Sequence, residues 1–118
     1  MLALVTLSSA LLCGCRQGGE APTVLALDQV PKAVEEAFKT AKPEVKAAVG
    51  QVVAALQAKD KVKAELAVQN LAARTDLNKA QRALTGQLLV TVNQELQAAA
   101  SSGDEQAAEV VRYKHLNK

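Results

Sequence analysis

The sequence predicts an all-α protein, a small bundle of four to five amphipathic helices arranged as stacked helical hairpins. Three observations favour this fold class. Ala, Leu, Val, Gln, Lys and Glu dominate the 118 residues, a composition that favours helix over sheet. Apolar residues recur at spacings of three and four from residue 28 onward, the period of a helix with one buried face. Helix caps and helix breakers separate the periodic stretches.

The first helix is predicted over residues 28–41. Asp28 is its expected N-cap, and Pro31 is tolerated within a first turn. Pro43 disfavours helical geometry at Lys42, so we expect a break there. The apolar stripe of this helix consists of Val30, Val34, Phe38 and Ala41.

The second and third helices, if separate, are predicted as an antiparallel hairpin, because the connection between them is very short. The alternative is one unbroken helix through Lys59-Asp60-Lys61. The second runs from Pro43, which suits a first helical position, to about Lys59. Gly50 lies inside it at a cost of about 1 kcal/mol relative to alanine, so we expect a close helix crossing there. Asp60 is the expected cap of the third helix, which ends near Arg74. The apolar faces are Val45, Val49, Val52, Val53 and Leu56, then Val62, Leu66, Val68, Leu71 and Ala72.

The fourth helix has the strongest start signal in the chain. Asn78 and Gln81 form a capping box, with an asparagine at the cap and a glutamine three residues later. This helix is expected to be the longest and to reach about Ala100, and a fifth helix follows over residues 104–116. The residues expected to face inward are Leu84, Leu88, Val92 and Leu96, then Ala107, Val110 and Val111.

Two helical hairpins followed by a last helix give an architecture that weakly resembles the tetratricopeptide-repeat family. Residues 60–71 and 104–115 both begin with Asp and carry an alanine four residues later, at Ala64 and Ala108. The Trp, Gly and Tyr positions of that family have no counterparts in the preceding helix. The resemblance therefore implies stacked helical hairpins and no particular ligand.

The N-terminus carries an apolar run that ends at Cys13-Gly14-Cys15. A membrane-spanning helix needs about 20 residues, whereas this run fits the apolar region of a secretory signal peptide. Leu12-Cys13-Gly14-Cys15 resembles the lipobox of bacterial membrane lipoproteins, although Cys13 stands where that family usually has Ala, Ser or Thr. No Lys or Arg precedes the run, which also departs from the usual signal pattern.

The lipoprotein resemblance implies three parts in this chain. Residues 1–14 would be a signal peptide, residues 15–27 the lipidated Cys15 and a flexible tether, and residues 28–118 the helical domain. The tether contains Gly18, Gly19 and Pro22, which break regular structure. In that family an Asp after the lipidated cysteine tends to retain the protein in the inner membrane, so Arg16 favours the outer membrane, with the domain facing the periplasm. The alternatives are secretion without lipidation, and metal binding or a disulfide at Cys13 and Cys15.

Composition and motifs also limit the classes of function. A formal net charge of +2 and the near absence of aromatic residues argue against nucleic acid as a partner. The sequence has no glycine-rich phosphate loop, nucleophile elbow or paired metal-ligand motif. His115 is the single histidine, and Glu35 and Glu36 are neighbours that do not face each other on a helix. We therefore expect no enzyme, no catalytic, cofactor-binding or metal-binding residues, and no small-molecule substrate.

The sequence thus favours a lipid-anchored protein-interaction or structural module with an unidentified protein partner. Two alternatives remain. The tail 113–118 is similar to the basic, Tyr-containing end of the murein lipoprotein family, which implies a peptidoglycan-attached spacer joined through Lys118. The other alternative is contact with an anionic surface through lysines expected at one end of the first hairpin, although Glu44 and Asp60 among them favour a solvated face. These lysines are Lys39, Lys42, Lys46, Lys59, Lys61 and Lys63.

Overall fold

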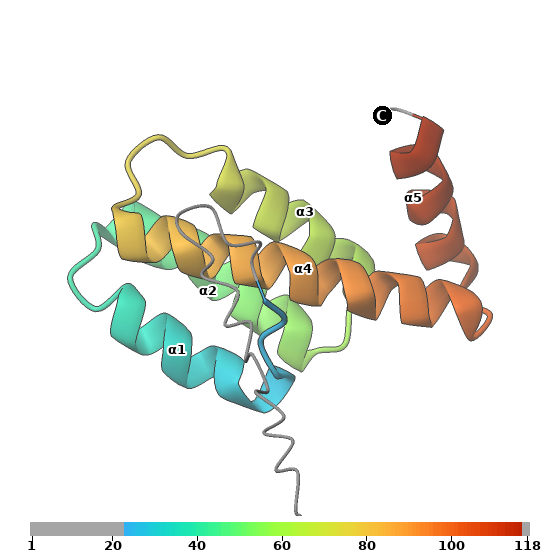
Figure 1. Cartoon of the computed structure of the whole chain (residues 1–118), viewed down its shortest axis with the longest axis horizontal. Helices are drawn as coiled ribbons and strands as arrows, with labels where there is room; N and C mark the ends of the chain where they lie inside the picture. The colour runs from blue at the N-terminus through green and yellow to red at the C-terminus, as the bar shows by residue number, and fades with distance from the viewer. Residues whose placement is uncertain (1–22, 117–118) are drawn as a thin grey trace, which may run out of the picture.

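Five α-helices and one short 3-10 helix form the part of the chain that the computed structural model describes, residues 23–116. These residues contain no strand, and the predicted all-α class is confirmed. The elements are η1 (Leu27–Gln29), α1 (Val30–Ala37), α2 (Pro43–Gln57), α3 (Lys61–Ala72), α4 (Lys79–Ser101) and α5 (Glu105–Leu116). α2 and α3 form the predicted hairpin, α1 and α3 pack on α4, and α5 turns away from the C-terminal end of α4 (Figure 1).

The core is built from valine, leucine and alanine side chains of α1 to α4. The stripe predicted for α4 is confirmed, since Leu84, Leu88, Val92 and Leu96 are all buried. α2 buries Val45, Val49 and Val52, as predicted; the predicted Val53 and Leu56 are half-buried, and Ala55 is buried as well. α5 contributes only Ala107 as a buried residue, and Val110 and Val111 are half-buried. The last helix is therefore the least firmly packed of the five.

The start of α1 differs from the prediction. Asp28 lies inside the 3-10 turn η1 and makes no cap, and α1 begins two residues later at Val30. The prediction was wrong because η1 leads directly into α1, so that the Val30 amide already donates to the Leu27 carbonyl. The helix also ends early, at Ala37, because the chain turns there toward α2.

The buried face of α3 is only partly the predicted one. Val68 and Leu71 are buried as predicted, but Leu66 is 63% exposed, Val62 is half-buried and Ala72 is exposed, and Ala64 and Ala67 are buried in their place. Residues 64, 67, 68 and 71 share one helical face, and residues 62 and 66 lie on another. The small alanine side chains let α3 approach its neighbours closely, so the face that carries Val62 and Leu66 is left outward.

α2 and α4 end in the same way, with a left-handed residue followed by an aspartate. That residue is Lys59 after α2, at φ 59°, and Gly103 after α4, at φ 101°. In both turns the aspartate amide donates to the carbonyl five residues earlier, at 3.0 Å. The Asp60 and Asp104 side chains then each accept from the amide three residues later, at 3.0 and 3.1 Å. Glycine is the usual residue in this motif, and a side chain there costs on the order of 1 kcal/mol.

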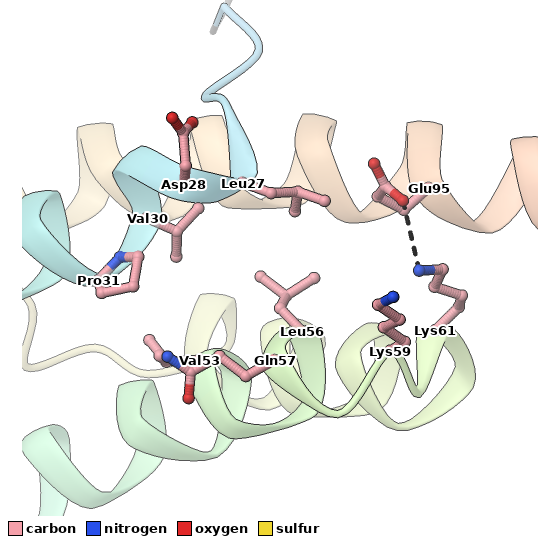
Figure 2. Close-up of a pocket in the computed structure, with 10 residues that line it drawn as sticks. All are labelled: Leu27, Asp28, Val30, Pro31, Val53, Leu56, Gln57, Lys59, Lys61 and Glu95. Carbon is pink, nitrogen blue, oxygen red and sulfur yellow. Dashed lines mark ion pairs between the residues drawn. The ribbon is translucent and has the colours of Figure 1, made fainter.

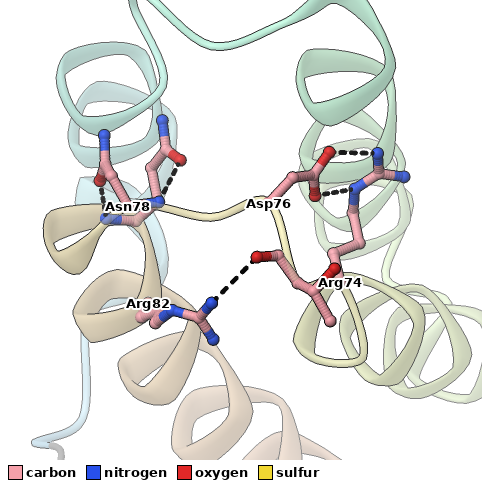
Figure 3. A network of polar contacts seen from close by, with 6 residues as sticks. Arg74, Asp76, Asn78 and Arg82 are labelled. Carbon is pink, nitrogen blue, oxygen red and sulfur yellow. Dashed lines mark hydrogen bonds and ion pairs between the residues drawn. The ribbon is translucent and has the colours of Figure 1, made fainter.

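The loop before α4 is held by local polar contacts. Both bonds of the predicted capping box are present, Gln81 N to Asn78 Oδ1 at 2.8 Å and Asn78 N to Gln81 Oε1 at 3.0 Å. Arg74 donates twice to Asp76, at 2.8 and 3.0 Å, and Arg82 donates to a loop carbonyl (Figure 3). The hydrogen bond from Arg74 holds the pKa of the Asp76 carboxyl below its ordinary value. Each of these contacts joins residues close in sequence, so they order the loop and the first turn of α4.

Replacing Gly50 by alanine is expected to stabilise the protein. The close helix crossing predicted at Gly50 is wrong, because the residue is exposed and a Cβ there would meet no atom within 4 Å. Gly50→Ala should raise the free energy of unfolding by about 0.5–1 kcal/mol, measured by urea denaturation. Gly103→Ala is the matched control and should be destabilising, because its φ of 101° strains any side chain. A loss of stability in Gly50→Ala would show that this face of α2 is packed.

Candidate binding surfaces

Cys15, Cys13 and Lys118 lie outside the described residues, as does the predicted signal peptide. Residues 23–27, the last part of the predicted tether, are described, and the chain there contacts α4. Leu25 donates to and accepts from the Thr91 hydroxyl, both at 2.9 Å. The chain is therefore fixed to α4 before η1 begins.

The lysines expected at one end of the hairpin lie at two opposite ends. Lys39, Lys42 and Lys46 flank the start of α2, whereas Lys59, Lys61 and Lys63 follow its C-terminus. The two groups are separated by the 15-residue length of α2, which spans about 22 Å at 1.5 Å per residue. The predicted single patch is wrong because α2 crosses the whole bundle between them.

The other titratable residues singled out in the sequence do not converge. His115, Glu35 and Glu36 are all exposed; the two glutamates lie side by side in sequence on α1, and His115 lies on α5. Residues 23–116 contain no group of three or more His, Cys, Asp or Glu side chains placed to hold a metal ion. Among the same residues, no helix combines the length and apolar character that crossing a bilayer requires.

A half-enclosed pocket of about 490 Å³ lies between η1 and the C-terminal end of α2, and we call it the η1–α2 pocket. Its two ends differ in chemistry. Leu27, Val30 and Leu56 lie at the apolar end, with Leu56 pointing from α2 toward η1, whereas Lys59, Lys61 and Glu95 gather at the other end (Figure 2). Lys61 and Glu95 form an ion pair of 3.4 Å, and the Asp28 carboxylate points away from Leu56. The remaining lining residues are Pro31, Val53 and Gln57.

A second concave surface, which we call the α3–α5 groove, lies between the first turns of α3 and the length of α5. Its volume is about 580 Å³. Leu66 and Tyr113 are 63% and 67% exposed and form much of its apolar wall. The other lining residues are Val62, Gln106, Glu109 and Val110. Large apolar side chains gathered in a shared depression are typical of an interaction surface.

A buried ion pair holds α5 in the position that forms this groove. Glu65 of α3 is 5% exposed, and its Oε1 lies 2.7 Å from Nζ of Lys114 on α5. Gln69 also donates to Glu65, and Lys114 donates to Asn93 of α4. Oε2 of Glu65 has no hydrogen-bond partner among the described residues. This pair is not predicted by the sequence, in which the one available signal is the position of Glu65 between Ala64 and Val68, on the face that α3 buries.

Comparisons with known proteins give no relative for this chain. No protein-family profile matches it, and neither a curated protein nor a solved structure is significantly similar to it.

Removing the Lys114 charge is expected to loosen α5. Lys114→Met keeps most of the aliphatic stem but leaves the buried Glu65 carboxylate without its cation, at a cost of about 1–3 kcal/mol. Urea denaturation measures the loss, and amide hydrogen exchange should localise the opening to α5. Adding Glu65→Gln to Lys114→Met should recover part of the stability, since the uncompensated buried charge is then absent.

The matched control for Lys114→Met is Lys61→Met. Its partner Glu95 is 31% exposed at the side chain, against 7% for Glu65. The more solvated pair is worth less, so Lys61→Met should cost under about 1 kcal/mol. Equal losses in the two variants would contradict the view that burial of Glu65 makes its ion pair important.

Proposed function

We propose that this protein is a lipid-anchored helical module that binds an amphipathic helix of a partner protein. The observation that carries the proposal is the apolar α3–α5 groove, where Leu66 and Tyr113 are largely exposed. The lipid on Cys15 holds the domain at a membrane, and the groove provides the contact with the partner. The protein carries out no catalysis.

The anchor is supported by Leu12-Cys13-Gly14-Cys15 at the end of an apolar run. One acyl chain binds a bilayer only marginally, whereas two or more hold a protein stably. Bacterial lipoproteins carry several chains, so a lipidated Cys15 is a permanent anchor. Arg16 favours the outer membrane, with the domain facing the periplasm.

A helical partner is supported by the shape and the chemistry of the groove. Two helices form its walls, and an amphipathic helix fits such a groove by its apolar face. The apolar wall residues recur at helical spacing, Val62 and Leu66 on α3 and Val110 and Tyr113 on α5. Glu109 is the charged residue that lines the groove, so the partner helix is expected to carry a Lys or Arg beside its apolar stripe.

The anchor is tested by labelling cells that produce the protein with a fatty-acid probe and then immunoprecipitating it. Wild-type protein should carry the label and fractionate with the outer membrane. Cys15→Ala should lose the label because the acceptor thiol is gone, and Cys13→Ala is the matched control, which should keep it. A wild-type protein without label, or a labelled Cys15→Ala variant, would contradict the proposal.

The groove is tested by placing a photo-crosslinking residue at Leu66 in the native host, with exposed Ala47 on α2 as the control position. A crosslink specific to position 66 should map to an apolar helical segment of one partner. With that partner purified, Leu66→Asp should abolish binding, because a carboxylate replaces an apolar contact. About 0.5 M salt should weaken the complex only slightly, since the contact is mainly apolar. Equal crosslinking from both positions, or full dissociation in salt, would overturn the proposed contact.

A further inference from the structure

We propose that the η1–α2 pocket binds a single-chain anionic amphiphile, an aliphatic carboxylate whose chain fills the apolar end and whose head contacts Lys59. This site is separate from the α3–α5 groove and does not depend on the lipid anchor. A volume of about 490 Å³ falls within the range of small-molecule sites. The occupant is a free monomeric amphiphile rather than a bilayer surface, because the pocket is half-enclosed.

The division of the pocket into two ends gives the class of ligand. Leu27, Val30 and Leu56 surround the apolar end, and Val30 is almost fully buried there (Figure 2). A ligand that fills this end must be apolar over most of its length. The polar end carries two ammonium groups and one carboxylate, and the carboxylate of Glu95 is already paired with Lys61 at 3.4 Å. Lys59 has no ion-pair partner among the described residues, so it is the cation available to an anionic head.

The backbone conformation of Lys59 also supports a functional role for this side chain. The residue has a φ of 59°, a left-handed conformation in which glycine is favoured. The equivalent turn after α4 has the same backbone hydrogen bonds and does contain glycine, at Gly103. The turn therefore does not require a lysine, and the lysine makes it less stable. A strained residue beside a pocket is expected where its side chain has a function.

The test measures binding of decanoate, decan-1-ol and acetate to the full ¹⁵N-labelled chain, below the concentration at which decanoate forms micelles. Amide chemical-shift changes give the affinity and locate the site. Decanoate is expected to shift residues 27–31 and 53–61, and to bind at least about 10-fold more tightly than decan-1-ol. Acetate should not bind measurably, because it lacks the chain. Vesicles of anionic phospholipid should not compete with decanoate.

Lys59→Gly separates the head contact from the fold. The variant keeps the turn, so its free energy of unfolding should equal or exceed that of the wild type. It should nevertheless bind decanoate no better than decan-1-ol, since the ammonium is gone. Lys63→Ala removes an exposed lysine that does not line the pocket and should leave the affinity for decanoate unchanged. Leu27→Gln should weaken decanoate and decan-1-ol alike, because Leu27 contacts the chain rather than the head.

Several outcomes would overturn the assignment. Decanoate binding that matches decan-1-ol in the wild type would remove the role of the head group. Wild-type affinity in Lys59→Gly would remove the role of Lys59, and vesicles that displace decanoate would assign the anion site to a membrane surface. Shift changes centred on Val62, Leu66 and Tyr113 would place the ligand in the α3–α5 groove and leave the η1–α2 pocket without an occupant.

Discussion

Burial of one face of α4 is the interaction on which the rest of the described structure depends. Leu88, Val92 and Leu96 are completely buried along this 23-residue helix. α1, α3 and α5 all pack on it, and the N-terminal segment is tied to it through Thr91. With Phe38 and Tyr113 as its only aromatic residues, the protein has no large ring around which to build a core. It relies on close contacts between valine, leucine and alanine faces, which a long central helix can provide to several neighbours.

The features that could be predicted from the sequence are those that local chemistry decides. The capping box of Asn78 and Gln81 forms because its two hydrogen bonds join residues three apart. Pro43 starts α2, and Asp60 caps α3, for similarly local reasons. The stripe of α4 was also predictable, because its large residues lie on one face. In each case the information is contained within one helix and the residues that cap it.

The features that could not be predicted depend on which helices meet. α3 has two apolar faces, and the one that packs carries Ala64 and Ala67 beside Val68 and Leu71, rather than Leu66. Hydrophobicity favours the leucine, but close approach to α2 and α4 favours the alanines. The spacing of apolar residues in α2 does not show whether a neighbouring helix crosses at Gly50, and the structure leaves that residue exposed. The ion pair of Glu65 with Lys114 joins residues 49 positions apart and has no local signature.

Both concave surfaces border the first turn of α3. Lys61 lines the η1–α2 pocket and the next residue, Val62, lines the α3–α5 groove. Asp60 caps this turn, and the ion pair between Lys61 and Glu95 ties the turn to α4. A change that unwinds the first turn would therefore damage both surfaces together. Variants that alter only side chains pointing into one surface are needed to tell the two apart.

The turn after α2 contains a residue that is less favourable for stability than the one at the same place in the turn after α4. The same backbone motif contains Gly103 in one case and Lys59 in the other. Domains of this size are stable by only about 5–15 kcal/mol, so a cost on the order of 1 kcal/mol at Lys59 is a measurable fraction. Solubility does not account for it, because Lys61 and Lys63 already supply charge at this end of the bundle. Local conflicts of this kind tend to lie at functional sites, and this one lies at the mouth of a pocket whose other wall is apolar.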